Sequence, residues 1–88
     1  DRHMVEIVIY SKDYCPYCVK AKNFLKQKGQ SFREIDITHD EKLQQELVTK
    51  SGGRRTVPQI FIGDTHVGGF DDMAALDKAG KLDALLKM

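Results

Sequence analysis

The sequence contains no tryptophan, only two prolines and only two cysteines, and it has no long run of apolar residues. A helix that spans a bilayer needs about 20 consecutive apolar residues, so a membrane protein is not expected. The net charge of +1 gives no general electrostatic reason to bind nucleic acid or an anionic membrane surface. These absences favour a globular protein, and 88 residues suffice for one small domain but not for a second domain with a hydrophobic core of its own.

The first few residues indicate where the expected domain begins. Residues 1–3 precede Met4 and are interpreted as a remnant of the expression vector, so residues 4–88 are taken as a single domain. No basic stretch followed by an apolar segment indicates a secretory leader. The small number of cysteines predicts a reducing compartment, and the cytoplasm is the default expectation.

Hydrophobic periodicity in the first half predicts a strand, a helix and a second strand. Residues 5–10 (VEIVIY) indicate a strand buried on both faces, and residues 32–37 (FREIDI) alternate as a half-buried strand does. Between them, residues 16–29 are typical of a helix with proline in its first turn and glycine at its end. Cys18 and Leu25 share the apolar face of this helix with Ala21.

The second half predicts a helix, a hairpin and two further helical segments. Asp40 is expected to cap a helix that ends near residues 51–53, and residues 58–62 and 65–68 are expected to form the hairpin. Asp71 or Asp72 is expected to cap the next helix, and Gly80 separates it from a last helical segment.

The order strand–helix–strand–helix–strand–strand–helix, with a C-terminal helical extension, predicts an α/β fold. A strand–helix–strand opening implies a parallel pair joined by a right-handed crossover. The closing hairpin adds antiparallel pairing. We therefore expect a four-stranded mixed sheet with helices on both faces.

Cys15 and Cys18 form a C-x-x-C motif at the predicted junction of a strand and a helix. A disulfide between them would restrain little of the unfolded chain, so reactivity explains the pair better than stability does. The N–H groups and dipole of a helix N-terminus favour the thiolate of Cys15, and Lys12 adds a positive charge nearby. Cys18 falls on the inward face, where it is less accessible. This asymmetry predicts that Cys15 attacks a disulfide and that Cys18 resolves the intermediate.

Three other roles of the cysteine pair stay open on the residues alone. A zinc site would need further ligands from His3, His39 or His66, and the sequence has neither a second C-x-x-C nor a closely spaced histidine pair. Two chains sharing a metal ion or an iron–sulfur cluster are the second alternative. Unreactive buried cysteines are the third. Redox chemistry fits the position of the motif best, and no metal is expected.

Three motifs in this order carry a resemblance to a known family: residues 15–18 (CPYC), 56–58 (TVP) and 68–72 (GGFDD). Over residues 4–88 the chain closely resembles a glutaredoxin of the dithiol C-P-Y-C type, nearest to the bacterial glutaredoxin 3 type. Thioredoxins, the nearest relatives, typically carry W-C-G-P-C instead. The resemblance implies a thioredoxin-like fold, glutathione as reductant, and a cis peptide bond before Pro58.

The resemblance also implies which residues bind glutathione. In family members the backbone at the position of Val57 pairs with the cysteinyl part, and Asp72 is expected to contact the γ-glutamyl end more directly than Asp71. Taken alone, residues 56–58 fit the start of a strand, and residues 69–72 fit a turn before an ordinary helix cap. The full implied set is Lys12, Tyr17, Thr56, Val57, Pro58, Gly69, Phe70, Asp71 and Asp72.

The charges near the third motif suit a γ-glutamyl group on physical grounds as well. A helix start offers N–H donors to a carboxylate, an aspartate offers a partner to an ammonium group, and glycines let a ligand approach closely. Arg54 and Arg55 either supplement this anion site or belong to a solvated loop. The resemblance implies that Lys12 flanks the glycine end of glutathione and Tyr17 its sulfur, whereas a lone loop lysine taken alone fits a solvated side chain.

The implied activity is glutathione-dependent thiol–disulfide exchange by two routes. Cys15 alone reduces protein–glutathione mixed disulfides, and Cys15 with Cys18 reduces protein disulfides. The expected partners are glutathione and disulfide-bonded or glutathionylated proteins, without nucleic acid or membrane, and the chain is expected to be a monomer. Two rival functions are an enzyme reduced by thioredoxin reductase and a two-chain module that binds an iron–sulfur cluster, against which Pro16 argues.

Overall fold

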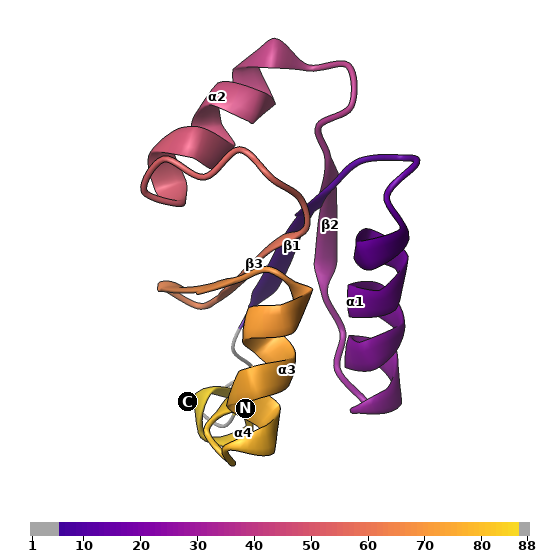
Figure 1. Ribbon diagram of the computed structural model, residues 1–88, viewed down its shortest axis with the longest axis vertical. Helices are drawn as coiled ribbons and strands as arrows, with labels where there is room; N and C mark the ends of the chain where they lie inside the picture. Colours follow the sequence, from indigo (N-terminus) through magenta and orange to yellow (C-terminus); the bar gives the residue numbers. More distant parts are fainter. Residues whose placement is uncertain (1–5, 87–88) are drawn as a thin grey trace.

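A mixed four-stranded sheet forms the centre of the structure, a computed structural model that describes residues 6–86 (Figure 1). The strands are β1 (Ile7–Ser11), β2 (Arg33–Asp36), β3 (Gln59–Ile62) and β4 (Thr65–Gly68), in the spatial order β2-β1-β3-β4. β1 pairs parallel with β2 and antiparallel with β3, and β3 pairs antiparallel with β4. The predicted mixed sheet is confirmed. The interpretation of residues 1–3 and the predicted strand start at residue 5 lie outside the described residues.

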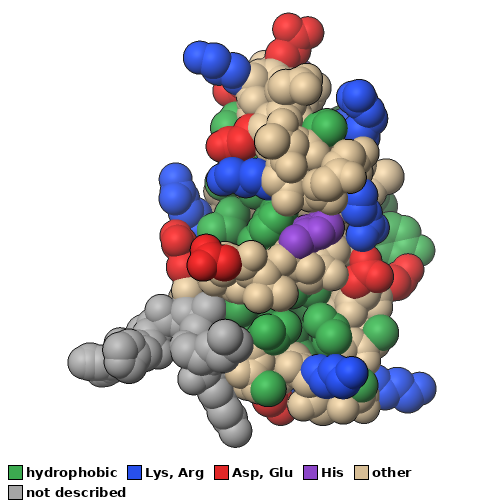
Figure 2. All heavy atoms as spheres, turned by 90° about the vertical axis from the view of Figure 1, so that its left-hand side faces the viewer, with side chains coloured by type: hydrophobic (Ala, Val, Ile, Leu, Met, Phe, Trp, Pro, Cys, Tyr) green, Lys and Arg blue, Asp and Glu red, His purple; other side chains and the backbone are tan. Residues whose placement is uncertain are grey.

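Helices cover both faces of the sheet, as predicted (Figure 1). α1 (Pro16–Gln27), α3 (Phe70–Lys78) and α4 (Leu82–Leu86) pack on one face, and α2 (Glu41–Lys50) packs on the other. In the described part of the chain, every helix is too short or too polar to cross a membrane. On the face shown in Figure 2, basic and acidic side chains are interspersed, in keeping with the net charge of +1.

The alternation of side chains along the central strands builds a separate hydrophobic core on each face of the sheet. The core beneath α2 is the smaller one, and its fully buried members are Tyr10, Ile37 and Leu47. The larger core joins the sheet to the other three helices. Its buried members are Ile7, Ile9, Ala21, Leu25, Ile60, Ile62, Met73 and Leu82.

Two helix termini form where the local sequence predicts them. Pro16 occupies the first turn of α1, and Gly29, just beyond the helix, adopts a left-handed φ of 72°. The Asp40 carboxylate accepts a hydrogen bond from the Leu43 N–H at 3.0 Å and so caps α2.

The start of α3 corrects one prediction, because neither Asp71 nor Asp72 is the N-cap. Gly69 takes that position, and the helix begins at Phe70. Asp72 lies in the first turn, where its Oδ2 accepts the Gly69 N–H at 2.9 Å. An aspartate can satisfy a helix N-terminus either as the cap itself or by reaching back from the third helical residue. The sequence pattern does not distinguish these two arrangements.

Candidate active site

Strand pairing brings the three motifs to one end of the sheet. Because β1 and β3 are antiparallel, with Tyr10 opposite Gln59, the loop that follows β1 lies beside the segment that precedes β3. Because β3 and β4 are also antiparallel, with Ile60 opposite Gly68, the start of α3 reaches the same place. An ideal Cβ on Gly69 would lie 3.5 Å from the Pro58 carbonyl oxygen, which shows how closely the second and third motifs approach.

Cys15 is the N-cap residue of α1, and its sulfur satisfies the first turn of that helix. Its backbone is extended, and its Sγ accepts a hydrogen bond from the Cys18 N–H at 3.1 Å. The same sulfur lies 3.6 Å from the Val57 carbonyl oxygen, to which a Cys15 thiol donates. Cys15 therefore lies at a helix N-terminus, where a thiolate is stabilised, as the sequence predicts.

Cys18 lies one turn further along α1 and is 1% exposed. Burial, followed by the interaction with the Cys15 side chain, raises the pKa of the Cys18 thiol to about 12, although a hydrogen bond from the Lys12 backbone opposes the shift. Cys18 is therefore a thiol at neutral pH, while the half-buried Cys15 remains accessible. This is the asymmetry predicted from the helix face.

Alkylation with iodoacetamide at pH 8 is expected to label Cys15 and to spare Cys18 in the folded, reduced protein. A thiol with a pKa of about 12 is ionised in only about one molecule in 10⁴ at that pH, and the buried sulfur is also shielded from the reagent. Fragmentation mass spectrometry of the peptide that contains both cysteines locates the label. Both should react in denaturant, whereas equal labelling in the folded protein would contradict the assignment.

Hydrogen bonds from β2 hold the loop that leads to Cys15. The buried Ser11 hydroxyl donates to Glu34 at 2.6 Å, and Lys22 of α1 binds the same carboxylate at 2.9 Å. These hydrogen bonds, first from Ser11 and then from Lys22, hold the pKa of Glu34 below its ordinary value. The Asp13 N–H donates to the Thr38 hydroxyl at 3.0 Å. Ser11 at the end of β1 and Asp13 within the loop are thus held by β2 and by the segment after it.

A cleft of about 350 Å³ lies between the start of α1, the segment before β3 and the start of α3. Rings from two helices meet at this cleft, since those of Tyr17 and Phe70 lie 6.4 Å apart. Eight of the nine residues predicted to bind glutathione line it, and the remaining one, Lys12, does not. The complete lining is Tyr17, Arg54, Thr56, Val57, Pro58, Gly69, Phe70, Asp71 and Asp72.

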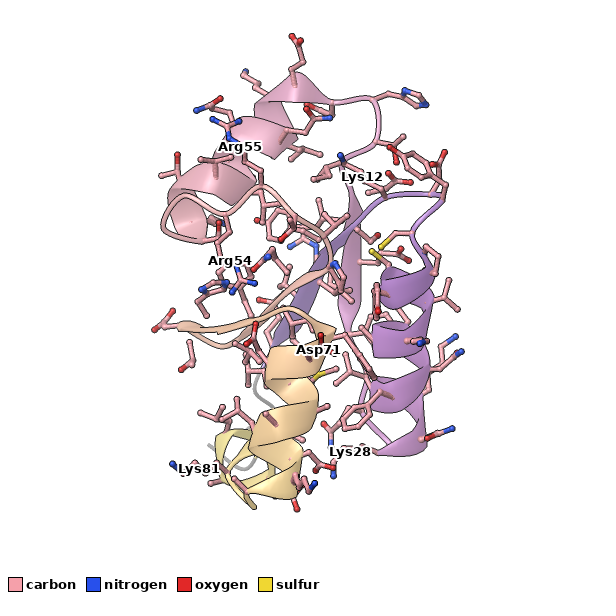
Figure 3. All side chains as sticks on the ribbon, in the orientation of Figure 1. Lys12, Lys28, Arg54, Arg55, Asp71 and Lys81 are labelled. Atoms are coloured by element: carbon pink, nitrogen blue, oxygen red, sulfur yellow. The ribbon has the colours of Figure 1, made fainter. Side chains whose placement is uncertain are left out.

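A second, more open cleft of about 500 Å³ contains Cys15 together with Lys12 and Arg55. Thr56 and Val57 line both clefts, so the two adjoin at the 56–58 segment. Figure 3 shows that the consecutive arginines extend in different directions, with Arg55 toward α2 and Arg54 toward the middle of the sheet. Lys12 is therefore placed with Arg55, on a different side of the site from Arg54.

A buried amide, absent from the predicted site residues, supports the 56–58 segment. Gln59 is fully buried in β3, and its Nε2 donates to the Thr56 hydroxyl at 3.2 Å. Its Oε1 lies 2.7 Å from Nε2 of His66 in β4. Because the amide oxygen only accepts, His66 Nε2 carries the hydrogen of this bond. A polar residue at the start of an otherwise apolar strand was the available signal.

Arg54 and Asp72 form an ion pair at the wall of the first cleft, 3.3 Å between Nη1 and Oδ2. The Gly69 N–H and then Arg54 hold the pKa of the Asp72 carboxyl below its ordinary value. Gly68 has a φ of 113°, and a Cβ there would overlap the Asp72 carboxylate, so a glycine is needed beside this pair.

Known proteins share both the sequence and the fold of this chain. The family model described as Glutaredoxin matches residues 7–67, which is more than half of the chain. The chain belongs to the glutaredoxin family. It is 54% identical over 83 residues to a glutaredoxin of Pseudomonas aeruginosa, covering 94% of this chain and 98% of that protein. It is 50% identical over 84 residues to glutaredoxin 3 of Escherichia coli K12, covering 96% and 100%.

A solved structure of a buckwheat glutaredoxin–glutathione complex also matches, with a TM-score of 0.84 at 34% identity, over 93% of this chain and 76% of that one. The resemblance to glutaredoxins and the thioredoxin-like fold class are therefore confirmed, and the chain is a thiol–disulfide oxidoreductase. The peptide bond between Val57 and Pro58 is cis, as the family implied. Within residues 6–86, no three His, Cys, Asp or Glu side chains gather as a metal site would need.

Proposed function

We propose that this glutaredoxin uses glutathione to reduce protein–glutathione mixed disulfides and protein disulfides. The observation that carries the proposal is the position of Cys15 beside the cleft that residues 56–58 and 69–72 line. Its sulfur is accessible, whereas the sulfur of Cys18 is buried. A γ-glutamyl peptide in the cleft therefore brings its own sulfur to the one cysteine that is able to attack it.

The proposed pose follows the charges of glutathione. Asp72 receives the ammonium group, and the N–H groups of the first turn of α3 receive the α-carboxylate. The backbone of Val57, whose carbonyl lies 3.6 Å from the Cys15 sulfur, pairs with the cysteinyl part. Lys12 lies toward the glycine end, and Tyr17 flanks the sulfur. The buckwheat glutaredoxin–glutathione complex supports this ligand class.

In the monothiol route, the Cys15 thiolate attacks the glutathione sulfur of a protein–glutathione disulfide. A Cys15–glutathione disulfide forms, and the protein sulfur leaves as a thiolate that takes up a proton. A second glutathione thiolate then attacks the glutathione sulfur of the intermediate and releases the Cys15 thiolate. One glutathione has been consumed for each protein thiol formed, and the product is oxidised glutathione.

In the dithiol route, the Cys15 thiolate attacks one sulfur of a protein disulfide and forms a mixed disulfide with it, while the other protein sulfur leaves as a thiolate that takes up a proton. Cys18 loses its proton as it attacks the Cys15 sulfur, and the second protein sulfur leaves as a thiolate that accepts a proton. The Cys15–Cys18 disulfide is then reduced by two glutathione molecules. The high pKa of Cys18 keeps it protonated until this step, so Cys15 acts first.

Cys18→Ser is expected to retain reduction of a glutathionylated protein and to lose protein-disulfide reduction by on the order of 100-fold or more. Only the second reaction needs the nearby internal thiol, whose loss makes resolution intermolecular. Both reactions are followed through NADPH consumption with glutathione and glutathione reductase. The same assay with thioredoxin reductase is the control. Turnover with thioredoxin reductase alone would overturn glutathione as the reductant.

The proposed function also includes a compartment, an oligomeric state and a class of protein substrates. We place the reaction in a reducing compartment such as the cytoplasm, with the chain acting as a monomer on disulfide-bonded or glutathionylated proteins. Recognition of glutathione, rather than of the attached protein, accounts for a broad range of substrates. The visible absorption spectrum of anaerobically purified protein tests the rival iron–sulfur function, which predicts a coloured dimer.

A further inference from the structure

The ion pair at the cleft wall suggests how the site distinguishes a γ-glutamyl end from simpler amines. We propose that Arg54 is a specificity-determining residue that neutralises Asp72 in the free protein and turns to the ligand's α-carboxylate when the ligand's ammonium reaches Asp72. This inference rests on the proposed function, because it names the recognition device of the same cleft. While the cleft is empty, the Arg54 guanidinium occupies the place beside Asp72 that the ligand's ammonium group would take.

The ion pair is positioned to exchange partners. The Arg54 and Asp72 side chains are 45% and 49% exposed, and both line the cleft. An exposed single ion pair contributes little net stability, so the protein loses little when the pair separates. The 3.3 Å contact is also longer than the usual distance of a strong charge-assisted hydrogen bond.

Each partner has an anchor that does not depend on the other. The Asp72 carboxylate is held by the Gly69 N–H at 2.9 Å, so it stays in the cleft when Arg54 leaves. The backbone of Arg54 is held on both sides by the nearly buried Ser51, whose hydroxyl accepts the Arg54 N–H at 3.0 Å and donates to its carbonyl at 2.9 Å. Only the Arg54 side chain is therefore free to turn.

A γ-glutamyl group carries its ammonium and its carboxylate on the same carbon atom. When the ammonium contacts Asp72, the carboxylate necessarily lies within a short distance of the displaced guanidinium. The planar guanidinium binds a carboxylate through two parallel N–H groups, so one ion pair of the free protein is replaced by two. The exchange is favourable only for a ligand that supplies both charges.

A ligand that carries the ammonium group but no α-carboxylate is expected to bind less favourably. It places a second cation beside Arg54 and offers no carboxylate in return, so like-charge repulsion opposes binding. γ-Aminobutyryl-cysteinylglycine is such a ligand, because it is glutathione without the α-carboxylate. Arg54 should therefore favour glutathione and disfavour this analogue, and its removal should shift the two affinities in opposite directions.

The test measures disulfide exchange in a Cys18→Ser background, where Cys15 forms a stable mixed disulfide. The protein is equilibrated with the oxidised and reduced forms of glutathione or of the analogue, and mass spectrometry gives the fraction of modified Cys15. Arg54→Gln is expected to lower the equilibrium constant for glutathione about two- to fivefold and to raise that for the analogue by a similar factor. Arg55→Gln, the matched control in the other cleft, is expected to shift both constants in the same direction.

Two outcomes would overturn the inference, and they differ in what else they overturn. If Arg54→Gln changes both constants in the same direction, or changes neither, while the parent protein forms the glutathione disulfide, the exchange role is wrong and the proposed function stands. If the parent protein forms no glutathione disulfide at Cys15, the proposed function and the inference fail together.

Discussion

Cys15→Ser is expected to abolish both the reduction of mixed disulfides and the reduction of protein disulfides, by on the order of 10³-fold or more. A serine oxygen forms no disulfide with glutathione or with a protein, so neither route has its first intermediate. Cys18 does not replace Cys15, because it is 1% exposed and its pKa is raised to about 12 by burial and by its neighbour. Initial rates with a glutathionylated protein and with a protein disulfide measure the loss.

Cys18→Ser is the matched control for this result, since it makes the same atomic exchange one helical turn away. It should keep the mixed-disulfide activity that Cys15→Ser loses. Circular dichroism shows whether each variant keeps the fold of the parent chain. Substantial mixed-disulfide reduction by a folded Cys15→Ser protein would contradict the assignment of Cys15 as the nucleophile.

Leu25→Ala is expected to lower the free energy of unfolding by about 2–5 kcal/mol. Leu25 is fully buried in α1 and belongs to the larger core, which joins that helix to the sheet, α3 and α4. Truncation removes apolar contacts and leaves a cavity that the neighbouring elements fill only in part. Small domains have total stabilities of about 5–15 kcal/mol, so this is a large fraction of the total.

Urea unfolding followed by circular dichroism measures this effect, with Val19→Ala as the control on the same helix. Val19 is 51% exposed, and alanine is the better helix former, so its replacement should change the stability by no more than about 0.5 kcal/mol. Equal losses in the two variants would indicate that α1 does not pack through its predicted apolar face.

The elements of the fold were predictable because their signals are local. Proline in the first turn of α1, the Asp40 cap of α2 and the glycine after α1 each act within a few residues, and the structure has all three. The start of the third helix does not follow from its local sequence alone. Its cap is Gly69, and Asp72 reaches back from inside the helix to accept the Gly69 N–H.

The candidate site was predictable in part, through resemblance rather than through spacing. The motif at residues 56–58 alone is compatible with an ordinary strand start, and it contains no sign of the buried Gln59 and His66 that support it. The two arginines before it are adjacent in sequence and indistinguishable by composition. In the structure one faces Asp72 and the other lines the cleft with Lys12.

The sequence by itself determined the unequal positions of the two cysteines, because a helix N-terminus and an inward helix face are both local properties. From these alone, Cys15 and Cys18 were predicted to have unequal roles. Only the tertiary structure decided what Cys15 faces. Antiparallel pairing of β1 with β3 brings Thr56 and Val57 beside its sulfur, and pairing of β3 with β4 brings residues 69–72 to the adjoining cleft, in both cases from more than 40 positions away. Sequence periodicity predicts strands, but the order in which they pair depends on how the whole chain buries its two cores.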